Sequence, residues 1–178
     1  MNLFKKIYIN APNSGLHLSV IPHRPIAYEG EARACSSLLG RAAANAFLPE
    51  VTSTIPWTND KDHPFPHHVW FQFQRPKTVT KIGFSTRINA DYFGQAPRKF
   101  DVIAGNSAED CSGDATSKAH VLLRIEEAGF QRANQAKSWL IPVEMRKPHL
   151  CIGISIHSSA GNGKFVSLQN MIMWESRV

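Results

Sequence analysis

Histidines gather in the segment 63–68, H-P-F-P-H-H, and imidazole is the side chain best suited to bind metals or move protons near neutral pH. His63 and His67 stand four residues apart, a spacing at which two imidazoles share one face of a helix. The two prolines of the segment forbid a helix, so a solvated loop explains these histidines better than a metal site. Asp62, beside His63, offers a carboxylate to a sugar hydroxyl or a cation, although a plain turn has the same composition.

A second group of polar and aromatic residues consists of Arg87, Asn89, Tyr92 and Phe93. Arg87 directly follows an expected strand, and its planar fork bonds two adjacent hydroxyls or one acidic group. Asn89 offers both a donor and an acceptor. Tyr92, Phe93 or Trp57 offers a ring that stacks on a sugar or enters a membrane interface. Two alternatives stay open, because Arg87 also suits a structural ion pair and Trp57 also suits the core.

The segment 159–164, S-A-G-N-G-K, has the glycines and lysine of a phosphate-binding loop. It does not match G-x-x-x-x-G-K-[ST], and no strand-loop-helix context surrounds it, which argues against nucleotide binding. Lys164 remains a candidate for facing an anionic ligand. We recognise no nucleophile, base and orienting acid at catalytic spacing. The sequence therefore predicts a binding protein rather than an enzyme.

The composition describes one basic globular domain. The chain has 178 residues, a formal charge of +6 and 43% hydrophobic residues, and its pI is about 9.4. This length suits one domain with a full core. A positive charge favours sulfated or sialylated glycans, phospholipid headgroups, nucleic acid or acidic proteins, unless it only keeps the surface soluble. No Lys/Arg run exceeds a pair, so we expect no nucleic-acid partner.

The cysteines and the N-terminus favour a cytoplasmic protein. Cys35, Cys111 and Cys151 are odd in number and lack a C-x-x-C pair, which fits neither a disulfide framework nor a zinc site. We therefore expect reduced thiols. No apolar h-region follows the first six residues, and no stretch has the length of a transmembrane helix. Cytoplasmic location is the expectation, with export by an unconventional route as the alternative.

Residues 69–87, V-W-F-Q-F-Q-R-P-K-T-V-T-K-I-G-F-S-T-R, predict two strands joined by a tight turn. Val69, Phe71 and Phe73 alternate with polar or outward residues, the period-2 pattern of a half-buried strand. The sequence Arg-Pro-Lys at 75–77 interrupts this strand, because proline lacks the N–H donor of a ladder. The second strand turns Ile82 and Phe84 inward, together with Thr80.

Alternation predicts further strands at 3–9, 16–20, 100–104, 120–125, 139–143, 150–156 and 166–174. In the strand 120–125 it turns Val121, Leu123 and Ile125 to one face. Residues 23–25, with two prolines in reach, read as a loop. Residues 40–47 predict one short helix, since Gly40 weakens a longer one. Residues 48–68 contain four prolines and predict a long, ordered, functional loop. Short strands with one weak helix indicate an antiparallel sandwich or barrel.

The order of these signals resembles the coagulation factor 5/8 type C, or discoidin, domain of the galactose-binding-like superfamily. The matching stretches are C-S-S at 35–37, A-A-N-A-F at 43–47, W-T at 57–58, V-W-F-Q-F at 69–73, P-K-T-V-T-K-I at 76–82, R-K-F-D-V-I-A-G-N-S at 98–107 and the terminal residues 150–174. The resemblance covers roughly residues 31–176. It implies an all-β, antiparallel jelly-roll β-sandwich with one short helix, preceded by residues 1–30 as an extension or edge hairpin of the single domain 1–178.

The resemblance also implies where a ligand binds. Members of this superfamily hold ligands with loops at one end of the sandwich, which correspond here to residues 52–68, 87–98 and 158–165. The family's Asp-Gly after N-A is replaced by L-P-E at 48–50, in a region that supplies calcium ligands in carbohydrate-binding relatives. Glu50 and Glu175 are the candidate ligands for calcium here. The family's terminal cysteine pair is absent, which fits an intracellular version or a lectin without a secretion signal.

The sequence therefore predicts a non-catalytic carbohydrate-binding module of discoidin type. Its candidate ligand-binding residues are Arg87, Asn89, Tyr92, Phe93, His63, Asp62 and Lys164. Homo-oligomers would raise the avidity of weak single sites. The alternatives are an intracellular protein-interaction or scaffold subunit, and a module for anionic phospholipids.

Overall fold

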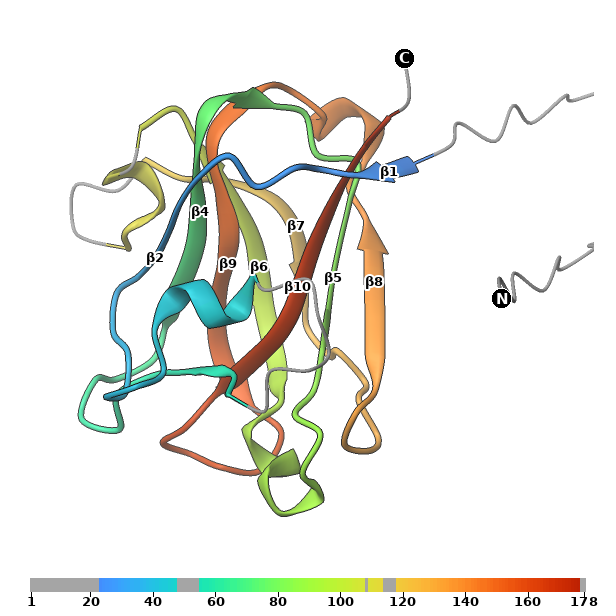
Figure 1. Ribbon diagram of the computed structural model, residues 1–178. Helices are drawn as coiled ribbons and strands as arrows, with labels where there is room; N and C mark the ends of the chain where they lie inside the picture. Colours follow the sequence, from blue (N-terminus) through green and yellow to red (C-terminus); the bar gives the residue numbers. More distant parts are fainter. Residues whose placement is uncertain (1–22, 48–54, 108, 114–117, 177–178) are drawn as a thin grey trace, which may run out of the picture.

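The computed structural model describes residues 23–47, 55–107, 109–113 and 118–176, which form a two-layer β-sandwich (Figure 1). Its strands are β1 (His23–Pro25), β2 (Gly30–Ala34), β3 (Trp57–Thr58), β4 (His67–Lys77), β5 (Lys81–Ser85), β6 (Pro97–Gly105), β7 (His120–Ile125), β8 (Ala136–Leu140), β9 (His149–Ser159) and β10 (Ser167–Ser176). The short 3-10 helices η1 (Ala43–Ala46), η2 (Ala90–Gln95), η3 (Glu109–Cys111) and η4 (Val143–Met145) connect them. No helix in this part of the chain is long and apolar enough to cross a membrane.

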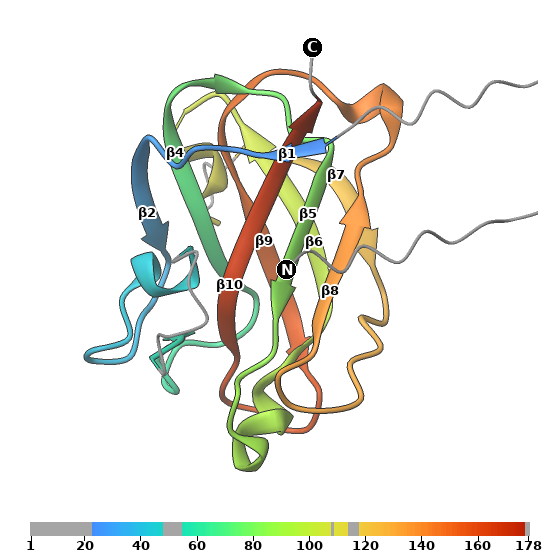
Figure 2. The same cartoon turned by 45° about the vertical axis from the view of Figure 1, so that its right-hand side comes forward.

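The strands form two antiparallel sheets that face each other. One sheet has the order β1-β10-β5-β8, with β3 also paired to β10, and the other has the order β2-β4-β9-β6-β7. Every strand pairing is antiparallel. Figure 2 shows β10 crossing in front of β9, with one layer before the other. This arrangement confirms the predicted all-β, antiparallel sandwich.

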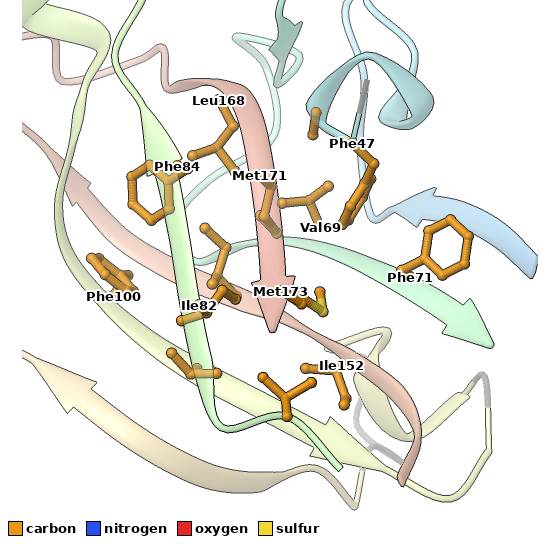
Figure 3. Close-up of a cluster of buried hydrophobic side chains, with 14 of the residues drawn as sticks. Phe47, Val69, Phe71, Ile82, Phe84, Phe100, Ile152, Leu168, Met171 and Met173 are labelled. Carbon is orange, nitrogen blue, oxygen red and sulfur yellow. The ribbon is translucent and has the colours of Figure 1, made fainter. Parts of the chain in front are cut away.

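The core lies between the two sheets, and the period-2 pattern selects its residues. The side chains of Val69, Phe71 and Phe73 on β4 are buried, and so are Ile82 and Phe84 on β5. The other buried contributors include Phe100, Ile152, Ile154, Ile156, Leu168, Met171 and Met173 (Figure 3). Burial of each such side chain stabilises the fold by about 1.5–3 kcal/mol, the main reason that the two layers pack.

The tight-turn prediction for residues 69–87 is wrong. Both strands exist, but β4 pairs with β2 and β9, whereas β5 pairs with β10 and β8. Residues 78–80 carry the chain from one sheet to the other, and Val79 and Thr80 are buried at that crossing. Pro76 does not end β4 either, since the strand continues to Lys77 after a register shift in its pairing with β9. The irregularity accommodates the missing N–H of the proline.

Several other boundaries differ from prediction. Residues 23–25 are not a loop but the edge strand β1, which pairs with β10. The expected helix 40–47 is the 3-10 turn η1, at residues 43–46. The strand expected at 139–143 is β8, at residues 136–140. In β7, Leu122 is buried and Val121 is exposed, because a register shift against β6 leaves Leu122 as the extra residue of a bulge.

The cysteine prediction is also wrong for two of the three residues. Cys111 and Cys151 form a disulfide across 40 residues of chain. It lies on the outer side of the β2-β4-β9-β6-β7 sheet, where Trp70 and Ile103 pack with it in a small second cluster. Cys35 is a free thiol. An odd cysteine count does not show which two meet, because η3 brings Cys111 back over β9 only in the folded chain.

Three predictions fall outside the described residues. They are the strands expected at 3–9 and 16–20 and the first part of the functional loop, residues 48–54. Within the rest of that loop, Trp57 and Thr58 form β3 and pair with Leu168 and Ser167.

Candidate functional site at the loop end of the sandwich

Loops that are distant in sequence meet at one end of the sandwich, the lower end in Figure 1. The loop after β9 is bonded through its backbone to the η2 loop. The Ala160 N–H donates to the Ala96 carbonyl at 2.8 Å, and the Gly161 and Asn162 N–H groups donate to the Gly94 carbonyl at 3.0 and 2.9 Å. These bonds hold two of the three predicted ligand loops against each other.

Asn59 ties the third loop to the same place. Its Oδ1 accepts from the Val166 N–H at 2.7 Å, and its Nδ2 donates to the carbonyls of Lys164 and Asp60. Asn59 is fully buried, and its side-chain amide adds to the backbone bond from the Asn59 N–H to the Val166 carbonyl. The end of the sandwich is therefore a connected platform rather than a set of separate loops.

A hollow of about 230 Å³ opens on this platform. Its lining residues are Leu38, Arg41, Thr58, Arg87, Tyr92, Gln95 and Phe165. The volume is slightly below that of pockets for drug-sized ligands, which suits a small ligand or one end of a larger one. We refer to it as the loop-end pocket.

Arg87 is held in the loop-end pocket by a buried polar chain. Its Nη1 donates to Gln95 Oε1 at 3.1 Å, and the same oxygen accepts from Ser167 Oγ at 2.7 Å. Ser167 Oγ in turn shares a hydrogen bond of 2.9 Å with Thr58 Oγ1. The Arg87 guanidinium also lies over the Tyr92 ring, 3.9 Å from its centroid. The structure thus fixes the guanidinium by hydrogen bonding and ring stacking, not by the ion pair considered as an alternative.

Arg41 brings a second cation to the loop-end pocket. Burial first, and then the neighbouring charge of Arg41, lower the pKa of Arg87. Arginine nonetheless stays protonated at neutral pH, since its ordinary pKa lies far above neutrality. The Nη1 atom of Arg41 is buried without a hydrogen-bond partner. Within the described ranges, neither guanidinium has an acidic partner.

The predicted site residues do not all converge. Arg87 and Tyr92 line the loop-end pocket together. Asn89 instead caps η2, with its Oδ1 accepting from the Asp91 N–H at 2.9 Å. Phe93 lies half-buried in η2 and outside the lining. Lys164 is exposed and contributes its carbonyl to Asn59.

Asp62 and His63 lie on the loop before β4 and also outside the pocket lining. The Asp62 N–H donates to Asp60 Oδ1 at 3.1 Å, an Asx-type turn that matches the plain-turn alternative. His63 Nδ1 lies 3.0 Å from the Pro64 carbonyl. Trp57 is fully buried, and its Nε1 donates to the Ser36 carbonyl. It is therefore a core residue, which was the alternative to a ring that contacts a ligand.

The histidine segment is only partly a solvated loop. His67 is fully buried, and one ligand atom each from Cys35, His63 and His67 lies within 4.8 Å of the others. Sulfur and nitrogen suit zinc or copper rather than calcium. However, His67 Nε2 lies 2.9 Å from Asn59 Nδ2, an amide nitrogen that only donates. That amide also donates to the Asp60 and Lys164 carbonyls, so three acceptors share its two N–H groups, and His67 Nδ1 is buried without a hydrogen-bond partner.

The calcium prediction rests on Glu50 and Glu175. Glu50 lies outside the described residues. Glu175 lies near the end of β10, and its carboxylate accepts from Arg24 Nε at 2.8 Å. An exposed ion pair of this kind contributes up to about 1 kcal/mol to stability. The Glu175 carboxylate is thus engaged by an arginine of β1.

Two larger hollows suit a polar ligand less well than the loop-end pocket does. One, of about 620 Å³, is lined mainly by apolar residues, among them Ile26, Tyr28, Phe47 and Phe71, and has no charged residue. The other, of about 390 Å³, spreads over the outer face of β5, β8 and β10, where Lys81 lies over the ring of Trp174. The loop-end pocket differs from both by combining two guanidinium groups, a buried amide and aromatic rings.

Solved structures share the architecture of this fold. No family model matches the chain, and no curated protein matches it either. The family 32 carbohydrate-binding module of NanJ from C. perfringens, in complex with galactose, is similar over 86% of this chain and 100% of that one, with a TM-score of 0.65 and 15% identity.

Two further structures match in the same way. A chitosan-binding module from a chitosanase/glucanase of Paenibacillus sp. IK-5 has a TM-score of 0.62 and 14% identity, and covers 85% of this chain and 99% of that one. The family 32 module of AlyQ, in complex with 4,5-unsaturated mannuronic acid, has a TM-score of 0.59 and 14% identity, and covers 84% and 98%. At these identities the likeness confirms the discoidin-like fold alone.

Sequence reasoning missed several residues of the loop-end pocket: Leu38, Arg41, Thr58, Gln95 and Phe165. None belongs to a periodic pattern that faces the pocket. The only local signal was the dipeptide W-T at 57–58, which marked Trp57 but not the hydroxyl beside it.

Proposed function

We propose that this chain is a non-catalytic carbohydrate-binding module that holds a saccharide in the loop-end pocket. The observation that carries the proposal is the fixed Arg87 guanidinium beside the Tyr92 ring. A planar fork of donors bonds vicinal oxygens, and an aromatic ring covers the apolar face of a pyranose. The structural neighbours, whose own names state carbohydrate binding, support the same class of ligand.

The non-catalytic part of the proposal rests on the lining of the pocket. Glycoside hydrolysis commonly needs two carboxyl groups that flank the scissile bond. Among the residues that the structure describes, the lining includes no carboxylate, histidine or cysteine. Some of the structural neighbours are modules of enzymes, such as the chitosanase/glucanase, so a binding role within a larger enzyme is compatible with this proposal.

We test the proposal with a glycan array, followed by calorimetry with the saccharides that bind. Arg87→Ala is expected to weaken binding about ten- to hundredfold, because a hydrogen bond to a charged group contributes roughly 1.5–3 kcal/mol. Arg24→Ala is the matched control, since it removes the same charge on β1, beside the far end of β10. A blank array, or equal binding by both variants, would contradict the proposed site.

An anionic membrane is the second candidate ligand, because the loop end exposes apolar side chains next to its two cations. Leu39 is 98% exposed and Ile88 is 43% exposed. Phe65, an aromatic residue of the loop before β4, fits this role less well, since its side chain packs on the core and on the His67 ring. Sedimentation with phosphatidylserine vesicles, lost in Leu39→Ser and at high salt, would favour this candidate over the saccharide.

We also propose a location outside the cytosol, the alternative of export. The Cys111–Cys151 disulfide supports it, because such bonds persist in oxidising compartments and are rare where glutathione keeps thiols reduced. A thiol count on protein isolated from its native source tests this proposal. One free thiol per chain is expected, and three would support the cytosol.

A further inference from the structure

We propose that the loop-end pocket selects saccharides that carry a carboxylate, which binds between the guanidinium groups of Arg41 and Arg87. This inference rests on the proposed function and adds the chemical class of the ligand. Both guanidinium groups line the same hollow. Among the described residues, neither has an acidic partner.

The first argument is electrostatic. Two like charges in a partly buried site repel, and the charge of Arg41 acts on Arg87 strongly enough to lower its pKa. Repulsion between cations away from bulk water is screened less than at an open surface. An anion placed between them converts that repulsion into attraction. A neutral sugar leaves the repulsion in place.

The second argument is an unmet hydrogen bond. Arg41 Nη1 is buried and has no partner, a costly state for a charged donor. Arg87 uses Nη1 for Gln95 and keeps its remaining N–H groups for a ligand. A carboxylate has two oxygens, accepts from two guanidinium groups at once and donates nothing. It therefore suits the guanidinium N–H groups of both arginines that line the hollow, although the buried Arg41 Nη1 itself has no surface that a ligand reaches in this conformation.

The third argument is the balance of donors and acceptors in the pocket. Gln95 Oε1 already accepts from Arg87 and from Ser167. Thr58 Oγ1 and Ser167 Oγ are bonded to each other. The internal network thus engages Gln95 Oε1 and both of these hydroxyls, which leaves the Tyr92 hydroxyl and the guanidinium donors for a ligand. Sugar hydroxyls need acceptors as well as donors, but a carboxylate needs donors only.

The aromatic residues are the reason that we expect the ligand to be a saccharide rather than a small free carboxylate. Tyr92 is 42% exposed, and Phe165 is half-buried at the opposite loop, so both present ring surface to the hollow. Aromatic rings of this kind contact the apolar face of a pyranose. A small carboxylate such as acetate meets the arginines but not the rings, and we expect it to compete only weakly.

The experiment uses the full chain and matched pairs of oligosaccharides of equal length and linkage: galacturonate with galactose, glucuronate with glucose, and mannuronate with mannose. Each member of a pair differs at one position, carboxylate against hydroxymethyl. We expect calorimetry to show at least one acidic oligosaccharide binding about tenfold or more tightly than its neutral partner. Its affinity should fall with sodium chloride, and the neutral partner's should not.

Two variants locate the effect. Arg41→Gln removes one charge but keeps a long donor side chain, and Gln95→Glu places a carboxylate on the Arg87 guanidinium, at the position of the 3.1 Å bond. Both should reduce the acidic-to-neutral affinity ratio about tenfold, with the ratio measured for each variant on the same pair of oligosaccharides. Arg24→Gln is the control and should keep the ratio. Thermal unfolding of each variant checks that the fold is retained.

The outcomes separate the two proposals. Binding of neutral oligosaccharides with equal or greater affinity overturns the acidic preference and leaves the saccharide-binding function standing. An acidic preference that survives in Arg41→Gln and Gln95→Glu overturns the assignment to this arginine pair. No binding to any acidic or neutral probe overturns both proposals.

Discussion

Protonation of His67 should weaken this fold in mild acid. His67 begins β4 and is fully buried. Its Nε2 faces the Nδ2 donor of Asn59, and its Nδ1 has no hydrogen-bond partner. Burial first, and then the charges of His63 and His68, lower the pKa of His67 from 6.5 to about 4. Added charge therefore has no acceptor to stabilise it.

The sign of the effect follows from the pH at which the unfolded chain and the folded chain each bind the proton. The unfolded chain takes it up near pH 6.5, and the folded chain only near pH 4. The stability that neutral His67 contributes is present above pH 6.5 and is lost as the pH falls from 6.5 to 4. At 1.36 kcal/mol per pH unit, the gap between these values corresponds to a loss of about 3 kcal/mol.

Urea unfolding at pH 7, 5.5 and 4.5 measures this loss, with His67→Gln as the variant that cannot titrate. The variant is expected to be less stable at pH 7, since Gln fills the ring's site poorly. Between pH 7 and 4.5 the wild type should lose about 2–3 kcal/mol more than His67→Gln. Carboxylates and His149, whose pKa burial also lowers, act in both proteins and cancel in the difference.

His120→Gln is the control for the substitution itself, because the exposed His120 ring lies near His149 rather than His67, and this variant should keep the part of the acid loss that His67 causes. Parallel curves for wild type and His67→Gln would refute the reasoning. A proton NMR titration of the His67 ring with a midpoint near 6.5 would refute it directly.

Two further predictions concern the packing of the β2-β4-β9-β6-β7 sheet. Gly153→Ala puts a Cβ 2.3 Å from the Val69 carbonyl oxygen and 2.5 Å from Trp70 Cα, both of them backbone atoms. We expect a loss of about 1–3 kcal/mol and a melting temperature lower by roughly 2–12 °C. Gly163→Ala meets no atom within 4 Å and should unfold like the wild type, and equal melting of the two variants would contradict the pairing of β4 with β9. Reduction of the Cys111–Cys151 bond, which closes 40 residues of chain, should cost about 4 kcal/mol. Calorimetry with and without dithiothreitol tests this, and an unchanged melting temperature would contradict it.

The sequence predicted most strands of this fold because alternation is a local property. Val69, Phe71 and Phe73 point inward in β4 as their spacing requires, and Ile152 and Ile154 do the same in β9. The order of motifs along residues 31–176 indicated the discoidin-like sandwich correctly. These features need no knowledge of which strand lies next to which.

Pairing partners and irregularities could not be predicted in this way. Adjacent strands β4 and β5 have the same alternation as a hairpin, but residues 78–80 carry the chain to the other sheet. The bulge at Leu122 buries that residue and exposes Val121, whereas Leu123 and Ile125 pack against the core as their alternation predicts. Cys111 meets Cys151 only because η3 folds over the outer face of β9. Each outcome depends on contacts between distant segments, which a local pattern does not contain.

The candidate site divides in the same way. Sequence alone identified Arg87 and Tyr92, since a charged residue at a strand end and an aromatic in the next loop are local signals. It could not identify Arg41 or Gln95, because loop residues follow no period and meet only through loop–loop packing. The sequence by itself determined which side chains turn inward. Tertiary structure decided which loops meet and where two unpaired guanidinium groups lie together, because long-range contacts alone set those distances.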